Sequence, residues 1–246
     1  MAREKRERSS TGYAHLITRG NNKQILFEED DDYRFYLSRL GKYAREQEIT
    51  INAYCLMENH VHLLVNDRNG NIPEMMKKIG VSYTNYYNRK YERSGHLFQG
   101  RYLSEPILDE VYLLTVFRYI LNNPRKAGIC PADQYRWSSY RAYFKTGTSI
   151  NIGFVRERFP TAEMYREYIG TANDDVCMEY EKAAQDDDWA LETIRNSLGI
   201  VSGSELQGLQ KKERDSALKR LKAAGLTVRQ IERLTGISRN IIQRAE

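Results

Sequence analysis

The sequence predicts a protein of the α+β class, in which an antiparallel sheet is followed by a small all-α domain. Two observations support this prediction. Strand-like and helix-like segments follow one another in the order β-α-β-β-α-β-α up to Asn123, and the last 36 residues carry a separate helical pattern. A chain of 246 residues with 41% hydrophobic content is long enough for one large core and a smaller second unit.

The first two elements are a strand and an amphipathic helix. Residues 13–20 (YAHLITRG) alternate in character and end at a glycine before a polar turn, which predicts a strand. Residues 29–47 carry aromatic and leucine side chains at near-helical spacing. Their acidic residues lie at the front, where the helix dipole favours them, so we expect a helix.

A tight hairpin should follow this helix. Residues 49–57 (ITINAYCLM) and 60–65 (HVHLLV) are rich in β-forming types, and only Glu58 and Asn59 separate them. We therefore expect two antiparallel strands joined by a two-residue turn.

A second helix, an edge strand and a third helix complete the predicted sheet domain. The second helix should run from Ile72 to about Arg93, and residues 101–108 (RYLSEPIL) should form a short edge strand because they include a proline. Asp109 should cap the third helix, which we expect Pro124 to end. This order of elements is compatible with a ferredoxin-like, split βαβ antiparallel sheet with one extra helix.

Changes in composition divide the chain into three predicted parts. Residues 1–147 should form the sheet domain, and residues 148–198 an acidic helical connector. Between Pro160 and Glu192 there are only two basic residues against ten acidic ones. Residues 199–246 should form a basic module, because the last 36 residues contain ten Lys and Arg against four Asp and Glu.

The basic module has the pattern of a helix-turn-helix. Apolar residues recur at helical spacing from Leu218 to Ile242, Gly236 lies at the short turn, and the second helix should begin near Ser238. Its exposed side chains are of types that contact base edges and phosphates in a major groove: Arg239, Asn240, Gln243 and Arg244. The alternative is a small helical interaction module with a solvated basic face.

The composition favours a cytoplasmic protein without membrane contact. The three cysteines, Cys55, Cys130 and Cys177, lie far apart and indicate neither a disulfide framework nor a thiolate zinc site. The charged N-terminal stretch leads into no apolar signal-peptide core, and no stretch reaches membrane-spanning length. Two basic blocks and a formal net charge of +5 point instead to a polyanionic partner.

Two residue pairs could carry chemistry. His60 and His62 lie two residues apart in a predicted strand, so both imidazoles point to one face. Tyr119 and Asn123 lie four residues apart and share one face of the third helix. Taken alone, the histidine pair is more often a hydrogen-bonded, half-buried feature than a metal site, and the helix pair can be an ordinary half-buried aromatic and a helix-ending residue.

Three segments together resemble one known family. "MENHVHLLV" (57–65), "YTNYYNRKYERSGHLFQGRY" (83–102) and "YLLTVFRYILNNPRKAG" (112–128) are similar, in order and spacing, to the single-tyrosine HUH transposases. The closest branch is that of the REP-associated tyrosine transposases. The resemblance spans roughly residues 10–145, and the C-terminal helix-turn-helix is an addition that the minimal family pattern lacks.

The resemblance implies a site and a reaction. Tyr119 matches the nucleophile, and His60, His62 and Asn123 match the metal ligands, a mixed donor set that suits Mg²⁺ or Mn²⁺. The implied activity is nicking and rejoining of single-stranded DNA near hairpins through a 5′-phosphotyrosine, by a monomer or a homodimer.

The segment 83–102 is a candidate DNA contact because basic and aromatic residues interleave there. Tyr83, Tyr87 and Tyr91 recur every four residues and should form a buried helix stripe. The basic residues remain as candidates for binding DNA: Arg89, Lys90, Arg93 and Arg101.

Two other functions remain open at this point. A non-catalytic, sequence-specific DNA-binding regulator would keep the fold but would not need Tyr119, His60, His62 and Asn123 together. A metal-dependent nuclease that uses water would keep the metal ligands but would survive the loss of Tyr119.

Overall fold

The computed structural model of this chain describes residues 9–145, 150–172, 175–179, 187–199 and 203–245. The chain forms two compact units, Met1–Glu179 and Tyr180–Glu246. Among the helices in the described ranges, none is long and apolar enough to cross a membrane.

The first unit is built on a four-stranded antiparallel sheet in the order β2-β3-β1-β4. Its strands are β1 (Tyr13–Arg19), β2 (Thr50–Met57), β3 (His60–Asn66) and β4 (Leu103–Pro106). β3 lies between β1 and β2, although only the helix α1 (Asp30–Glu46) lies between those two strands among the α-helices and strands of the sequence. This is the split βαβ order that the sequence predicts, and the proline-containing strand β4 lies at an edge, where a missing backbone donor is tolerated.

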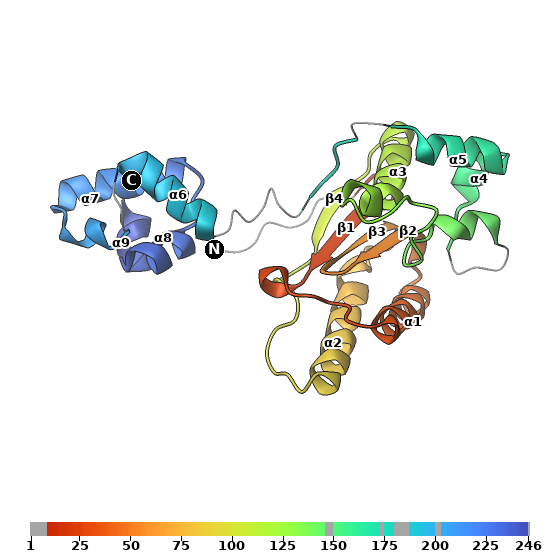
Figure 1. Cartoon of the computed structure of the whole chain (residues 1–246), viewed down its shortest axis with the longest axis horizontal. Coiled ribbons are helices and arrows are strands. Elements are labelled where there is room, and N and C mark those ends of the chain that lie inside the picture. Colours follow the sequence, from red (N-terminus) through yellow and green to blue (C-terminus); the bar gives the residue numbers. More distant parts are fainter. Residues whose placement is uncertain (1–8, 146–149, 173–174, 180–186, 200–202, 246) are drawn as a thin grey trace. The chain divides into compact units, whose positions relative to one another are not determined.

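Helices cover both faces of the sheet (Figure 1). The helices α1 (Asp30–Glu46) and α2 (Ile72–Lys90) lie on one face, and α3 (Glu110–Lys126) lies on the other. Side chains of β3 alternate between the two cores: Val61, Leu63 and Val65 pack with α1 and α2, whereas Leu64 packs with α3. The predicted tyrosine stripe of α2 is confirmed for Tyr83 and Tyr87, which are buried on this first face.

The helix α3 begins as predicted but ends later than predicted. Asp109 caps it, accepting a hydrogen bond from the Tyr112 backbone amide. Pro124 does not end the helix, which continues to Lys126. A proline inside a helix lacks the N–H donor and crowds the carbonyl four residues before it, but the amides that follow still bond, including Ala127 N–H to the Asn123 carbonyl.

The residues that follow the predicted boundary at 147 complete the first unit. Asn151 donates its backbone N–H to the Ile51 carbonyl at the sheet edge. The short helices α4 (Gly153–Arg158) and α5 (Ala162–Gly170) then place Val155, Tyr165 and Ile169 in the same apolar core as α3. The first unit therefore extends to Glu179, because the apolar side of α3 would otherwise face water. Two 3₁₀ turns, Asn21–Lys23 and Tyr140–Phe144, also belong to this unit.

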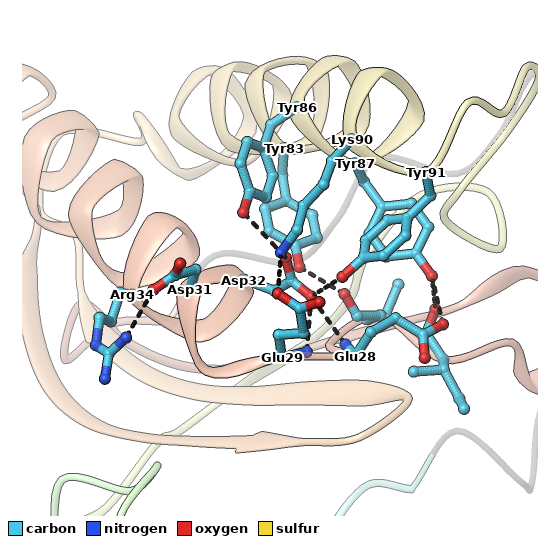
Figure 2. Close-up of polar contacts among 12 residues, drawn as sticks. Glu28, Glu29, Asp31, Asp32, Arg34, Tyr83, Tyr86, Tyr87, Lys90 and Tyr91 are labelled. Carbon is cyan, nitrogen blue, oxygen red and sulfur yellow. Dashed lines mark hydrogen bonds and ion pairs between the residues drawn. The ribbon is translucent and has the colours of Figure 1, made fainter.

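A buried carboxylate joins the helices α1 and α2. The Asp32 side chain is fully buried and accepts hydrogen bonds from the backbone amides of Glu28 and Glu29 (Figure 2). Two side chains of α2 and the residue that follows it donate to the same carboxylate: Tyr86 at 3.0 Å, Lys90 at 2.7 Å and Tyr91 at 2.7 Å. Burial alone would raise the pKa of Asp32, but these donors outweigh it and the pKa is lowered.

The second unit is entirely helical in the part of it that the structure describes. It contains α6 (Asp187–Leu198), a 3₁₀ turn (Gly203–Gly208), α7 (Lys211–Ala223), α8 (Val228–Thr235) and α9 (Arg239–Arg244). Thr227 and Gln230 form a capping box at the start of α8. Gly236 ends α8 with a left-handed φ of 70°, and Ser238 occupies the N-cap position of α9 without a side-chain capping hydrogen bond, so the turn and the start of the second helix lie where the helix-turn-helix pattern predicts them. The predicted connector is thus split, since α6 packs Ala190 and Ile194 into this core.

We predict that Lys90→Met lowers the free energy of unfolding of the first unit by about 3 kcal/mol, because Asp32 would keep its buried charge without its cation. Chemical denaturation measures the loss. The neighbouring, exposed Arg89 provides the control, and Arg89→Met should change the same quantity by less than about 0.5 kcal/mol. Equal effects of the two substitutions would show that Lys90 is an ordinary surface lysine.

Candidate active site

The central strand β3 directs His60 and His62 toward α3. His62 is buried and lies opposite Ile17 of β1 and Cys55 of β2, whereas His60 lies at the start of the strand opposite Arg19. The two imidazole ring centroids are 5.0 Å apart. The predicted common face of the two histidines is therefore confirmed.

A third histidine, His15 of β1, contacts His62. Its Nε2 lies 3.0 Å from Nδ1 of His62, and the two rings are stacked. Its other nitrogen, Nδ1, faces the carboxylate of Glu105 on β4 at 3.7 Å, which is too long for a hydrogen bond but short enough for electrostatic attraction. With Nδ1–H of His15 directed at Glu105, Nε2 of His15 accepts a hydrogen bond from Nδ1–H of His62, and Nε2 of His62 keeps its lone pair.

The first histidine, His60, is oriented in a similar way. Its Nδ1 lies 2.7 Å from the side-chain oxygen of Asn59, in the hairpin turn. This contact leaves Nε2 as the nitrogen available to a ligand.

The environment keeps these imidazoles neutral. Burial lowers the pKa of His60 to about 4, with a further lowering from the charge of Arg19. Burial also lowers the pKa of His15 and that of His62, the latter well below its ordinary value. Neutral imidazole is the form that binds a metal, so no proton has to leave before a cation enters.

The helix α3 places Tyr119 and Asn123 over the histidines. The Tyr119 ring lies 5.8 Å from that of His62 and 6.0 Å from that of His15, edge to face in both cases. One turn further, the Asn123 amide nitrogen donates to the Tyr119 carbonyl at 3.0 Å, and the Asn123 side chain also forms a hydrogen bond with His60. Four residues predicted from two separate segments are thus brought together.

The donor set at this place fits a divalent cation. His60 and His62 each offer a neutral Nε2, and Asn123 offers an amide oxygen, the mixed nitrogen and oxygen set that suits Mg²⁺ or Mn²⁺ in a partly open site. Among the described residues, no group of three or more His, Cys, Asp and Glu side chains could hold a metal. The candidate set therefore comprises two imidazoles and one amide.

The hydroxyl of Tyr119 is buried under the segment 175–179. Only 3% of the Tyr119 residue is exposed, and its Oη donates to Glu179 Oε1 at 2.8 Å. The Lys126 ammonium lies 4.4 Å from the centroid of the Tyr119 ring and 3.8 Å from the same Glu179 oxygen. Burial raises the pKa of Tyr119, and the hydrogen bond to Glu179 raises it further.

The candidate DNA-binding residues of the first unit lie in different settings. Arg89 and Arg101 are exposed, and Arg101 lines a cavity of about 650 Å³ between α2 and the loop before β4. Arg93 is exposed but donates to the Gln24 side chain at 2.7 Å. Lys90 is held by Asp32 and by Glu29, at 2.7 and 3.1 Å, so its charge is already neutralised within the fold.

The candidates of the second unit lie together on α9. The four side chains are all exposed: Arg239, Asn240, Gln243 and Arg244. Arg239 forms an ion pair with Glu232 of α8 at 2.6 Å. Among the contacts described, the side chains of Asn240, Gln243 and Arg244 have no such partner.

Sequence reasoning missed two residues of this site. The sequence pattern could have indicated His15, because this residue alternates with buried apolar residues in the same way as the two histidines of β3. No sequence pattern indicates Glu179, because it lies in an irregular segment far from any motif.

Known proteins that are similar to this chain include one transposase family and two solved structures. Residues 8–123 match the family model described as "Transposase IS200 like". The fold is similar to the structure of a REP-associated tyrosine transposase bound to a REP hairpin, with 16% sequence identity and a TM-score of 0.54, over 73% of this chain and 96% of that chain.

A second solved structure is less similar. It is a candidate transposase from Deinococcus radiodurans R1, with 20% identity and a TM-score of 0.34, over 49% of this chain and 96% of that chain. No curated protein sequence matches the chain.

We predict that Mn²⁺ binding depends strongly on His60 and less strongly on His15. His60→Ala should abolish measurable binding in calorimetry, because one imidazole and one amide make a weak site. His15→Ala should weaken binding by about 10- to 100-fold, because it removes the group that orients His62. His96→Ala is the control, since His96 is exposed on the loop after α2 and should have no effect. Unchanged affinity in His60→Ala would remove β3 from the metal site.

Proposed function

Because this chain belongs, through residues 8–123, to the IS200-like transposases, whose members are HUH DNA-nicking enzymes, we propose that it is a metal-dependent DNA strand-transfer enzyme. It would nick and rejoin single-stranded DNA near hairpins through a 5′-phosphotyrosine on Tyr119. The observation that carries this proposal is the meeting of Tyr119 and Asn123 from α3 with His60 and His62 from β3.

Each residue has a role that its chemistry supports. His60, His62 and Asn123 would hold a divalent cation through two imidazole nitrogens and an amide oxygen. Mg²⁺ or Mn²⁺ bound there would supply Lewis-acid polarisation of the scissile phosphate. His15 would keep His62 in the tautomer and orientation that binding requires.

Tyr119 would act as the nucleophile. Its Oη forms a bond to phosphorus, the bond from phosphorus to the 3′ oxygen breaks, and a free 3′-hydroxyl is released. The phosphodiester is conserved as a covalent link to the protein, so a second 3′-hydroxyl can attack it and rejoin DNA. The sequence contains no nucleotide-binding glycine loop, which agrees with a reaction that needs no ATP.

The DNA would contact exposed basic residues of the first unit. Arg89, Arg93 and Arg101 remain candidates, whereas Lys90 is committed to the buried Asp32. A hairpin substrate is proposed because the similar solved structure is that of a transposase bound to a REP hairpin.

The second unit would select the DNA site. The helix α9 presents Asn240, Gln243 and Arg244 to solvent, in the position of a helix-turn-helix recognition helix. Asn and Gln can read the edge of adenine, and arginine can bind guanine or a phosphate.

We predict that Tyr119→Phe abolishes cleavage and the covalent adduct but leaves Mn²⁺ binding and hairpin binding unchanged, because phenylalanine keeps the ring packing. Hairpin oligonucleotides labelled at either end are incubated with the protein and Mn²⁺ and run on a denaturing protein gel. Wild type should retain the label from the DNA 3′ of the cut, and the variant should retain none.

The other outcomes of this experiment identify the rival functions. Cleavage by Tyr119→Phe without an adduct would show a nuclease that uses water. A wild type that binds DNA and never cuts it would show a regulator. An adduct that persists in the variant would place the nucleophile on another of the 18 tyrosines.

We predict separate effects for two side chains of α9 on binding to a duplex selected from a randomised pool. Asn240→Ala should cost about 1–3 kcal/mol on the selected duplex and little on a scrambled one, because it removes a base contact. Arg244→Ala should weaken binding to both and reduce the salt dependence, as expected for a phosphate contact. Fluorescence anisotropy at several salt concentrations measures both effects. Lys219→Ala on α7 is the control, and an equal loss there would argue against recognition by α9.

A further inference from the structure

We propose that Glu179 is a catalytic residue: its carboxylate accepts the proton of the Tyr119 hydroxyl during DNA cleavage and returns that proton when the strand is rejoined. This inference rests on the proposed function and adds to it the group that activates the nucleophile. It concerns a residue outside the segment 8–123 that matches the family model.

The contact between the two residues has the geometry of proton transfer. Tyr119 Oη lies 2.8 Å from Glu179 Oε1, and the hydroxyl is the donor. This distance is within the range required of a general base and the proton that it takes. The two residues also differ in their exposure, because the tyrosine is buried whereas the glutamate side chain is 46% exposed. A proton accepted by Glu179 can therefore be exchanged with water.

The segment that carries Glu179 is anchored on the helix that carries Tyr119. Arg118 of α3 binds Asp175 with two parallel hydrogen bonds of 2.6 Å each. Lys126, at the end of α3, donates to the Asp175 carbonyl at 3.1 Å. Between these contacts and Glu179, the buried side chain of Cys177 packs into the core beside α3. The segment that leads to Glu179 is thus fixed to α3 at Asp175 and Cys177.

The nucleophile needs a base because of its surroundings. An ordinary phenol has a pKa of about 10, so its hydroxyl keeps its proton near neutral pH and is a weak nucleophile. Attack by the neutral hydroxyl would place a positive charge on its oxygen in an apolar environment, unless the proton leaves as the new bond forms. Glu179 is the acceptor in contact with that oxygen.

The proposed step is balanced. The bond between Tyr119 Oη and phosphorus forms while the phenolic proton moves to Glu179 Oε1. The bond between phosphorus and the 3′ oxygen breaks, and this oxygen takes a proton from solvent water. In rejoining, the incoming 3′-hydroxyl loses its proton to water, and protonated Glu179 returns its proton to the departing tyrosine oxygen, as microscopic reversibility requires.

Lys126 weakens the electrostatic repulsion between the Glu179 carboxylate and the phosphates of DNA. Its ammonium lies 3.8 Å from Glu179 Oε1 and 4.4 Å from the centroid of the Tyr119 ring. A cation close to both the carboxylate and the phenol ring reduces the repulsion that Glu179 would exert on an incoming phosphate.

The test is a single-turnover measurement of adduct formation with a labelled hairpin oligonucleotide and Mn²⁺. Glu179→Gln should slow adduct formation by about 10²- to 10⁴-fold, because glutamine cannot accept the proton. The affinities for the hairpin and for Mn²⁺ should stay within about two-fold of wild type, since neither depends on proton transfer. Glu163→Gln is the matched control on an exposed position of α5 and should cleave at the wild-type rate.

A rescue experiment separates a base from a structural contact. Replacing Tyr119 with 3,5-difluorotyrosine lowers the pKa of the phenol, so a general base becomes less necessary. The difference in rate between Glu179 and Glu179→Gln should therefore shrink by at least about ten-fold in the fluorinated protein. A glutamate that only supports the fold would cause the same loss in both proteins, which would overturn the proposal.

Two further outcomes would also overturn it. Faster cleavage by Glu179→Gln would show that the carboxylate holds Tyr119 away from DNA, and an unchanged rate would show that it has no role. In either case wild type still forms the adduct and the proposed function stands. A wild type that forms no adduct would overturn the proposed function and this inference together.

Discussion

The antiparallel register of β3 between β1 and β2 is the constraint on which the rest of the first unit depends. Both faces of β3 are buried, with Leu63 and Val61 against α1 and α2, and Leu64 against α3. Because side chains alternate with a period of two residues, a slip of one residue would turn His60 and His62 into the wrong core. The apolar residues that fix the register of β3 thus also determine where the two imidazoles point. The candidate site is therefore formed when the sheet folds.

Buried polar groups in this unit are compensated in two different ways. His15 and His62 are buried in their neutral form and share one hydrogen bond, and the other ring nitrogen of His15 faces Glu105 at 3.7 Å. Asp32 remains charged and needs two backbone amides and three side-chain donors, as Figure 2 shows. This difference follows from the cost of burial, which is far larger for an ion than for a neutral ring. The neutral histidines keep a ring nitrogen available to a ligand, whereas the Lys90 ammonium is already paired with Asp32.

The segment 150–179 changes the solvent exposure and the contacts of α3. Without this segment, the helix would cover the sheet with one face and leave the other in water. With it, Ile169 accepts a hydrogen bond from Asn122, Asp175 pairs with Arg118, and Tyr119 becomes buried. A buried tyrosine hydroxyl is shielded from solvent and therefore requires an acceptor within the protein. The same segment supplies both the burial and the acceptor, which links the extension of the domain to the chemistry of the site.

The sequence alone determined the features that depend on neighbours within a few residues. The order of elements, the alternation that pairs His60 with His62, the spacing that pairs Tyr119 with Asn123 and the turn at Gly236 are all local patterns, and the structure contains each of them. Only the tertiary structure decided which distant residues meet. The contacts of His62 with His15, of Lys90 with Asp32 and of Tyr119 with Glu179 span 47, 58 and 60 residues. The position of Pro124 inside α3 was also decided there, because packing on both sides of the helix outweighs the local tendency of proline to end it.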